Sequence, residues 1–309
     1  MAEYLPEGKR IDTARNLGFL SSPRTVREAM ERGEILEARA VLCDSEHNLS
    51  VDMGCMRGLI PRIEGAVGIR EGTVRDIAVI SRVGKVVCFL VSDIVTDARG
   101  RELAVLSRAA AQRRCVAEYV NTLSPGDIIP VRVTHLEPFG AFCDIGCGVV
   151  ALMPIDTVSV SRIEHPDERF TVGMDIRAVI KSRVGTRITL SHKELLGTWE
   201  ENAAAFSVGE TVPGVIRSVE NYGAFVELKP NLAGLAELRD DLRVGSAASV
   251  YIKSIIPQRM KIKLIIIDSF DRPPTAEEPR YFLTQGHIDR FVYSPSDCDK
   301  YVATDFTAQ

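Results

Sequence analysis

Pro138-Phe139-Gly140-Ala141-Phe142 and, later in the chain, Asn221-Tyr222-Gly223-Ala224-Phe225 share one pattern: an aromatic residue, a glycine, an alanine and a second aromatic residue. In a strand, residues three apart point to opposite faces, but a bulge at the intervening glycine lets both rings share one surface. Two exposed rings on one surface suit stacking on unpaired nucleic-acid bases, because every base has a π-face. Packing of the rings in a core is the alternative, and it is strongest for the second ring of each pair.

The two stretches lie in two long repeats. One constant shift along the sequence superposes four landmarks: Gly126 on Gly209, Pro130 on Pro213, Phe139 on Tyr222, and Phe142 on Phe225. A longer shift reveals an earlier copy by matching two landmarks: Gly33 to Gly126 and Pro61 to Pro154. That shift places Glu46 and Leu49 at the aromatic positions, so we expect the first repeat to lack both rings.

Each repeat contains several short strand-like runs, a glycine-rich bend, and a loop between the third and fourth runs. Short strands of this kind, with the patterning of a small closed barrel, leave no unpaired sheet edge. Each repeat is about the size of an OB-fold. We therefore expect an all-β protein of three tandem five-stranded OB-fold barrels joined by short helices, with an N-terminal helix and an aromatic-rich C-terminal tail.

The boundaries follow from turn and helix signals. Ser22-Pro23 predicts a helix start, Ser124-Pro125-Gly126 ends a predicted helix, and Lys193 to Phe206 has apolar residues at helical spacing, which indicates a linker helix packed on the preceding barrel. The expected organisation is a helical segment 1–32, a degenerate OB-fold 33–108, a linker helix 109–124, an OB-fold 125–193, a linker helix 194–207, an OB-fold 208–270, and a tail 271–309.

The repeats resemble S1 domains, the OB-fold RNA-binding modules named after a ribosomal protein of the small subunit. After the aromatic-Gly-Ala-Phe stretch, the third repeat continues with Gly234-Leu235, Val244-Gly245 and Lys261-Ile262-Lys263-Leu264, as that family does. The first repeat is recognised through Gly58-Leu59-Ile60-Pro61 and Val105-Leu106-Ser107-Arg108. The resemblance covers roughly residues 33–270 and is strongest in the second and third repeats.

The resemblance implies a nucleic-acid-binding face built from the two aromatics, a histidine after the Gly-Leu pair, and a basic residue before the last strand. The histidine position holds Pro154 in the second repeat and Glu237 in the third, so that contact is missing from both, and Glu237 opposes a phosphate. Further basic residues lie nearby in both repeats. The expected RNA-binding residues are Phe139, Phe142, Lys181, Arg183, Arg187, Tyr222, Phe225, Lys253 and Lys261.

Charge and composition limit the kind of binding. The chain has 309 residues, a formal net charge of −4 and a pI near 5.8. A protein that coats duplex DNA relies on many Lys and Arg contacts to phosphate, so this composition argues against that mode. Any nucleic-acid binding has to be local, and a solvated charged face is the alternative for the basic residues.

Cysteine use and hydropathy indicate a cytoplasmic protein. The seven cysteines are odd in number and most sit in apolar runs, which fits reduced thiols acting as small hydrophobic residues. Cys143 and Cys147 are four apart without a second pair of ligands, so they are expected to be structural thiols. No secretion leader or membrane span is apparent, and no membrane partner is expected.

Enzyme motifs are absent from the sequence. No His-Glu-x-x-His, Cys-x-x-Cys or glycine-rich phosphate loop occurs, and the five histidines are scattered: His47, His135, His165, His192 and His287. His287 and Asp289 are expected to serve in capping or docking, since nothing nearby completes a catalytic set. The sequence thus predicts a non-enzymatic protein without a cofactor.

The sequence leaves two functions open. The first is binding of single-stranded RNA, in particular mRNA, by the second and third barrels in translation, with residues 1–108 docking on a ribosome or another protein. The second is a protein-interaction scaffold whose barrels have lost most RNA affinity. Residues 272–279 read as a linker, and the aromatic tail after them is too apolar to be disordered, so we expect it to pack on a barrel, covering an edge or adding a strand fragment.

Overall fold

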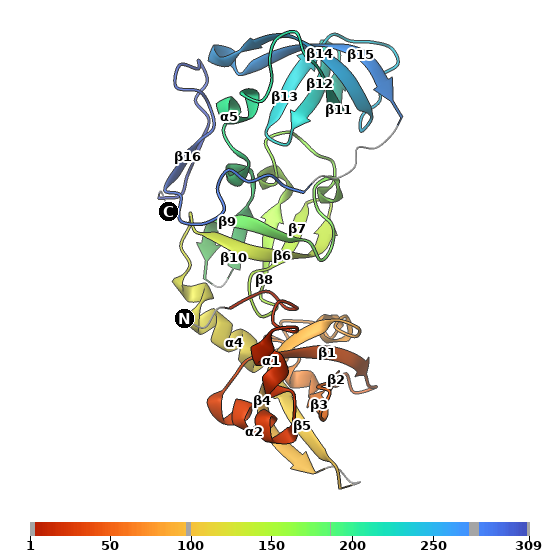
Figure 1. Cartoon of the computed structure of the whole chain (residues 1–309), viewed down its shortest axis with the longest axis vertical. Coiled ribbons are helices and arrows are strands. Elements are labelled where there is room, and N and C mark those ends of the chain that lie inside the picture. Colours follow the sequence, from red (N-terminus) through yellow and green to blue (C-terminus); the bar gives the residue numbers. More distant parts are fainter. Residues whose placement is uncertain (1–3, 97–99, 186, 272–277, 308–309) are drawn as a thin grey trace. The chain divides into compact units, whose positions relative to one another are not determined.

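A computed structural model describes residues 4–96, 100–185, 187–271 and 278–307 (Figure 1). The chain forms two compact units. The first contains Met1–Leu123 and Asp144–Val150, and the second contains Ser124–Cys143 and Ala151–Gln309. Three closed five-stranded barrels carry the fold, as the sequence predicts. None of the helices in the described ranges is long and apolar enough to cross a membrane.

The first barrel has the strand order β1-β2-β3-β5-β4. Its strands are β1 (Leu36–Cys43), β2 (Leu49–Asp52), β3 (Arg57–Ile60), β4 (Val86–Thr96) and β5 (Glu102–Ser107). The helices of this unit are α1 (Ala14–Phe19), α2 (Pro23–Arg32), η1 (Arg62–Glu64), α3 (Ile77–Ile80), α4 (Arg108–Glu118) and η2 (Val120–Thr122). Helix α2 starts where predicted, because Ser22 caps it in a capping box and Pro23 occupies its first turn.

The second and third barrels keep the same connectivity, with sheet orders β10-β8-β7-β6-β9 and β11-β12-β13-β15-β14. The second consists of β6 (Ile128–Glu137), β7 (Gly140–Asp144), β8 (Val150–Pro154), β9 (Asp175–Val184) and β10 (Arg187–Ser191), with η3 (Ile155–Thr157) and η4 (Pro166–Glu168) in its long loop. The third consists of β11 (Thr211–Glu220), β12 (Gly223–Lys229), β13 (Leu232–Ala236), β14 (Ala247–Ile256) and β15 (Lys261–Phe270), with η6 (Pro257–Arg259) between the last two.

The linker after the second barrel is broken rather than continuous. It consists of η5 (Lys193–Leu196) and α5 (Trp199–Ala203), separated by Gly197 with a φ of 84° and by the N-cap Thr198. The break turns the apolar residues in two directions. Leu195 packs with Val179 of the second barrel, whereas Trp199 belongs to the core of the third. The prediction that the whole helix packs on the preceding barrel is therefore wrong.

The C-terminal tail packs on the second unit without joining a barrel sheet. Its strands β16 (Arg290–Val292) and β17 (Ala303–Asp305) form a separate two-stranded sheet. Tyr293 enters the core of the third barrel, and its hydroxyl donates to the Asn231 carbonyl at 2.6 Å. His287 Nδ1 lies 2.7 Å from an Asp127 carboxylate oxygen, so this tail residue contacts the start of the second barrel. The predicted linker residues 272–277 lie outside the described residues.

Another tail residue, Tyr281, contacts the buried His192. The Tyr281 hydroxyl lies 3.1 Å from His192 Nε2, while His192 Nδ1 lies 3.0 Å from the Val158 carbonyl. Burial lowers the pKa of His192 to about 4, so this imidazole is neutral at physiological pH. The tail thus packs against a neutral, hydrogen-bonded side chain at the end of the second barrel.

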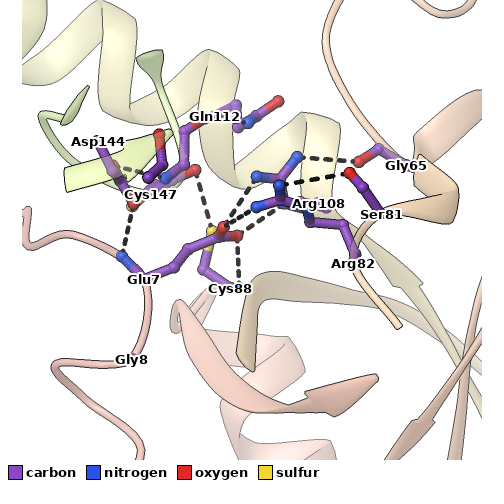
Figure 2. A network of polar contacts seen from close by, with 12 residues as sticks. Glu7, Gly8, Gly65, Ser81, Arg82, Cys88, Arg108, Gln112, Asp144 and Cys147 are labelled. Carbon is purple, nitrogen blue, oxygen red and sulfur yellow. Dashed lines mark hydrogen bonds and ion pairs between the residues drawn. The ribbon is translucent and has the colours of Figure 1, made fainter. Parts of the chain in front are cut away.

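The first unit encloses a buried polar network that the sequence does not predict (Figure 2). Arg108 at the start of α4 donates from Nε and Nη2 to the two Glu7 carboxylate oxygens at 2.7 and 2.9 Å. The Glu7 amide donates to Asp144 at 2.7 Å, and the Cys88 amide donates to Glu7 at 3.0 Å. Burial opposes ionisation of Glu7, but Arg108 outweighs it and the net pKa is lowered. The segment around Glu7 is therefore part of the interior of this unit.

A second buried ion network lies within the second unit. Arg217, the bulge residue of β11, donates to both carboxylate oxygens of Glu227 at 2.9 and 3.1 Å. Arg169 also pairs with Glu227, and Glu168 of the long second-barrel loop pairs with Arg217. Glu227 is only 5% exposed. The network therefore ties the loop of one barrel to a strand of the next.

Removing the shared carboxylate should destabilise this unit. Because Glu227→Gln leaves two arginines buried with one charge less between them, we expect a loss of about 3 kcal/mol in the free energy of unfolding. Urea unfolding followed by fluorescence of Trp199, the single tryptophan, which is buried against the third barrel, measures it. Asp241→Asn breaks the exposed pair with Arg239 and should cost less than about 1 kcal/mol. Equal losses in the two variants would contradict the structural role of Glu227.

Candidate nucleic-acid interface

The aromatic pairs lie at the surface as ring clusters. Phe139 is 55% exposed and Tyr222 is 65% exposed, while Phe142 and Phe225 are half-buried. The centroids of Phe139 and Phe142 are 5.9 Å apart with ring planes at 89°, and those of Tyr222 and Phe225 are 6.2 Å apart at 88°. The edge-to-face geometry is the same in both barrels. Each pair therefore presents two ring surfaces outside the barrel core.

The glycine between the rings has a different role from the one predicted. The irregularity in the β11–β12 ladder lies between Ile216 and Ser218 on β11, not at Gly223, which starts β12. Tyr222 therefore precedes the strand, and this allows it to lie beside Phe225. A Cβ atom at Gly223 would lie 2.4 Å from the Ala236 carbonyl oxygen. Only glycine permits that approach.

The second barrel shows the same constraint. A Cβ atom at Gly140 would lie 2.3 Å from the Met153 carbonyl oxygen and 3.0 Å from the Cα atom of Pro154. Gly140 is the first residue of β7, just as Gly223 is the first residue of β12. The aromatic-Gly-Ala-aromatic pattern is thus a strand-entry motif in which the first ring stands before the strand and the second stands within it.

A lysine occupies the same bulge in the fourth strand of both barrels. In β9, Ile180 pairs with Leu190 and Ser182 pairs with Thr189, so Lys181 is the extra residue. In β14 the ladder skips Lys253 in the same way. Lys253 is exposed and Lys181 is half-buried. The bulge gives the second and third barrels a cationic side chain at the same position. The sequence alone does not show that Lys181 and Lys253 are equivalent.

Of the remaining predicted basic residues, Arg187 and Lys261 occupy equivalent positions in their barrels. Arg183 lies on the opposite face of the β9–β10 sheet from Arg187. Arg187 and Lys261 are exposed and open the fifth strand of their barrels. Arg183 pairs with the buried Ile188, and paired residues share one face of a sheet. Its Nε donates to the Gly185 carbonyl at 3.0 Å. The register therefore separates Arg183 from Arg187.

Glu237 weakens the cationic character of the third barrel. It follows β13 at the position where similar domains carry a histidine, and it is strongly exposed. Its carboxylate lies 4.0 Å from the ammonium of Lys253. The bulge lysine of this barrel is therefore partly neutralised at the surface, whereas the second barrel has the uncharged Pro154 at the matching position.

The first barrel lacks the site, but its register corrects the residues assigned to it. Leu49 pairs with Ile60 as Ala224 pairs with Ala236, so Leu49 matches the core alanine and not an aromatic residue. The aromatic positions hold His47 and Ser50 instead of Glu46 and Leu49. By the same register, Ser92 occupies the bulge of β4 and Leu103 matches the basic position.

A loop also covers part of this surface in the first barrel. Asp76, in the segment between β3 and β4, accepts from Arg62 Nε at 2.7 Å. His47 Nδ1 lies 3.3 Å from the same carboxylate. The ring that stands where Tyr222 stands in the third barrel is therefore in contact with a carboxylate.

One aromatic neighbour of the second-barrel site was missed by the sequence reasoning. His135 on β6 lies beside Phe142, with ring centroids 6.1 Å apart and planes 26° apart. Its Nε2 lies 2.7 Å from the Glu137 carboxylate. Strand alternation from the buried Val131 and Val133 would place His135 on the core face, so the sequence gives no sign of its exposure. The matching residue of the third barrel, Ser218, follows an irregularity in the β11–β12 ladder.

The described residues offer no alternative metal centre. Within ranges 4–96, 100–185, 187–271 and 278–307, no three His, Cys, Asp or Glu side chains gather in a way that could hold a metal ion. Cys143 and Cys147 are both buried, as expected for structural thiols. The surface features that recur between barrels are rings and cations, which suit a polyanion with exposed bases.

The fold consists of tandem OB-fold barrels, and rings and cations recur at matching surface positions of the second and third. Residues 122–193, which contain the second barrel, match the family model of the S1 RNA binding domain. The chain is 28% identical over 273 residues to small ribosomal subunit protein bS1 of Staphylococcus aureus strain COL, covering 86% of this chain and 65% of that protein.

A second relative is similar to the same extent. The bS1 protein of Staphylococcus epidermidis is 28% identical over 274 residues, with 86% of this chain and 64% of that protein covered. The chain thus spans about 65% of the length of these curated relatives. A multidomain protein with nucleic acid binding domains from Streptococcus pneumoniae covers 76% of this chain and 74% of its own, at 13% identity and a TM-score of 0.24, which adds nothing to the assignment.

The strand-entry glycine gives a direct test of the site geometry. Gly223→Ala should lower the free energy of unfolding by about 1–3 kcal/mol, because its methyl group collides with the Ala236 carbonyl and separates β12 from β13. Urea unfolding monitored through Trp199 reports the change. Gly18→Ala is the control, since a Cβ atom there has no neighbour within 4 Å, and it should not destabilise the protein. An unchanged Gly223→Ala protein would contradict the proposed constraint.

Proposed function

We propose that this protein binds single-stranded RNA on the aromatic and basic faces of its second and third barrels. The observation that carries the proposal is the recurrence of one surface arrangement in two barrels: an exposed ring pair, a bulge lysine and a basic residue opening the fifth strand. A purely structural role does not require an exposed ring and two cations at matching positions. The first barrel, which has kept the fold, has lost all of them.

Stacking gives such a face useful affinity on an acidic chain. Base–aromatic stacking contributes about 1–3 kcal/mol per base and does not depend on net charge. The few cations contact few phosphates, so affinity should fall with salt less steeply than for a duplex-coating protein. The net charge of −4 is therefore compatible with binding, and it favours single strands, whose bases are available for stacking.

We assign this binding to translation, with mRNA as the RNA. The support is the likeness to proteins named as small ribosomal subunit protein bS1. We further propose a cytoplasmic location and assign residues 1–108 to docking on a ribosome or another protein. At the matching positions the first barrel has one ring, His47, which contacts Asp76, and no lysine or arginine, since the others hold Ser50, Ser92 and Leu103. The absence of enzyme motifs from the sequence supports a binding role without catalysis.

A scaffold function is the second candidate. The observation in its favour is the proximity of Lys253 to Glu237, which reduces the positive charge of the third barrel. A scaffold of this kind predicts no measurable RNA affinity near physiological salt, together with co-sedimentation of a protein partner. The two functions therefore differ in a single binding measurement.

The exposed rings are the first target for that measurement. Phe139→Ala combined with Tyr222→Ala should reduce affinity for a single-stranded RNA by at least tenfold, because each variant removes a stacking surface. Fluorescence anisotropy with a labelled oligonucleotide at fixed salt gives the dissociation constants. Both rings are more than half exposed, so the thermal stability should be preserved. Unchanged affinity in the double variant would refute the proposed face, and no affinity in the parent protein would favour the scaffold.

The acidic residue in the third barrel makes the opposite prediction. Glu237→Gln should increase RNA affinity up to about fivefold, because it frees Lys253 from its surface ion pair and removes a charge that repels phosphate. The gain should shrink as salt is raised, since surface charges are screened. Glu200→Gln is the charge-matched control on helix α5 and should leave affinity unchanged. A gain of equal size in both variants would show that only net charge matters.

A further inference from the structure

His135 occupies a position that distinguishes the second barrel from the other two. The shift that superposes Phe142 on Phe225 also superposes His135 on Ser218, and Ser218 pairs with Phe225 across the β11–β12 ladder. In the first barrel, Leu42 pairs with Ser50 in the same way. Among the three matched positions, only the second barrel has a ring.

The geometry of His135 suits contact with a ligand. Its side chain is 62% exposed, and its plane lies within 26° of the Phe142 plane at a centroid distance of 6.1 Å. The centroid of Phe139 also lies 5.9 Å from that of Phe142, with the two ring planes nearly perpendicular. Phe142 is therefore the middle ring of a cluster in which His135 adds a near-parallel surface.

A neighbouring carboxylate holds the histidine ring in this orientation. Glu137 lies two residues along β6, on the same face of the strand, and its Oε1 is 2.7 Å from His135 Nε2. An exposed ring normally samples several rotamers, so this contact reduces the entropy lost when a base packs against it. Glu137 therefore acts as a positioning residue for the His135 ring.

We infer that His135 is a third stacking residue of the second barrel, so that this barrel contacts one base more than the third barrel and holds single-stranded RNA more tightly. The inference rests on the proposed function, because it names a further contact of the same face. The higher affinity of the second barrel then has two causes: one more ring than the third barrel, and no carboxylate at the position of Glu237. Ser218, which is half-buried, supplies no ring surface at the matching place.

Variants of the full-length protein test this assignment in a background where the third-barrel rings are removed by Tyr222→Ala and Phe225→Ala. The probe is a labelled single-stranded RNA of about 12 nucleotides, within the range of OB-fold site sizes. His135→Ser, which copies the third barrel, should weaken binding about 5- to 100-fold, the effect of losing one stacked base. His135→Phe should retain affinity within about threefold, since it keeps a ring.

Two further variants separate the possible outcomes. Ser218→His, introduced into the chain that carries Phe139→Ala and Phe142→Ala, should strengthen the remaining binding by the third barrel. Unchanged affinity of His135→Ser, in a background where Phe142→Ala abolishes binding, would overturn the inference and leave the proposed function standing. If Phe142→Ala has no effect either, the proposed function itself fails. Matching melting temperatures show that the variants remain folded.

Discussion

The close approach of a strand-entry glycine to a neighbouring carbonyl is the constraint on which the interface depends. At Gly140 and Gly223 a side chain would collide with the carbonyl oxygen of Met153 or Ala236. Because the strands are this close, the residue before the glycine stands at the barrel rim beside the aromatic residue two positions after it. The same contact thus holds two neighbouring strands together and places two rings on the surface of the barrel.

The three barrels share a core and differ in what their surfaces carry. Inward residues follow the same register in the first and third barrels, which explains why the fold persists in the first barrel without the ring pair. The long loop after the third strand also differs in use. In the first barrel its Asp76 binds His47, whereas in the second barrel its Glu168 and Arg169 join the buried network around Glu227. In the first barrel this loop therefore contacts the residue at the first aromatic position, whereas in the second barrel it contacts the third barrel instead.

The sequence predicts the barrels and the ring pairs because both depend on local pattern: alternation in strands and a repeated motif. Prediction from the sequence is wrong or incomplete where the repeats align only with a gap, or where a contact joins residues far apart in the chain. An ungapped shift assigned Leu49 to an aromatic position, although the register makes it a core residue. The Glu7–Arg108 pair joins residues about a hundred positions apart, and the bulge at Lys181 depends on two strands at once. Neither leaves a signal in a single segment.

Mapping of RNA crosslinks on the full chain tests the central claim most directly, namely that the face is kept in two barrels and lost in one. Ultraviolet irradiation of the complex with single-stranded RNA, followed by mass spectrometry of the attached peptides, identifies the contacting residues. We expect crosslinks in the peptides containing Phe139 and Phe142 and those containing Tyr222 and Phe225, with none around His47 and Ser50. Crosslinks concentrated in the first barrel, or absent from both aromatic stretches, would contradict this claim.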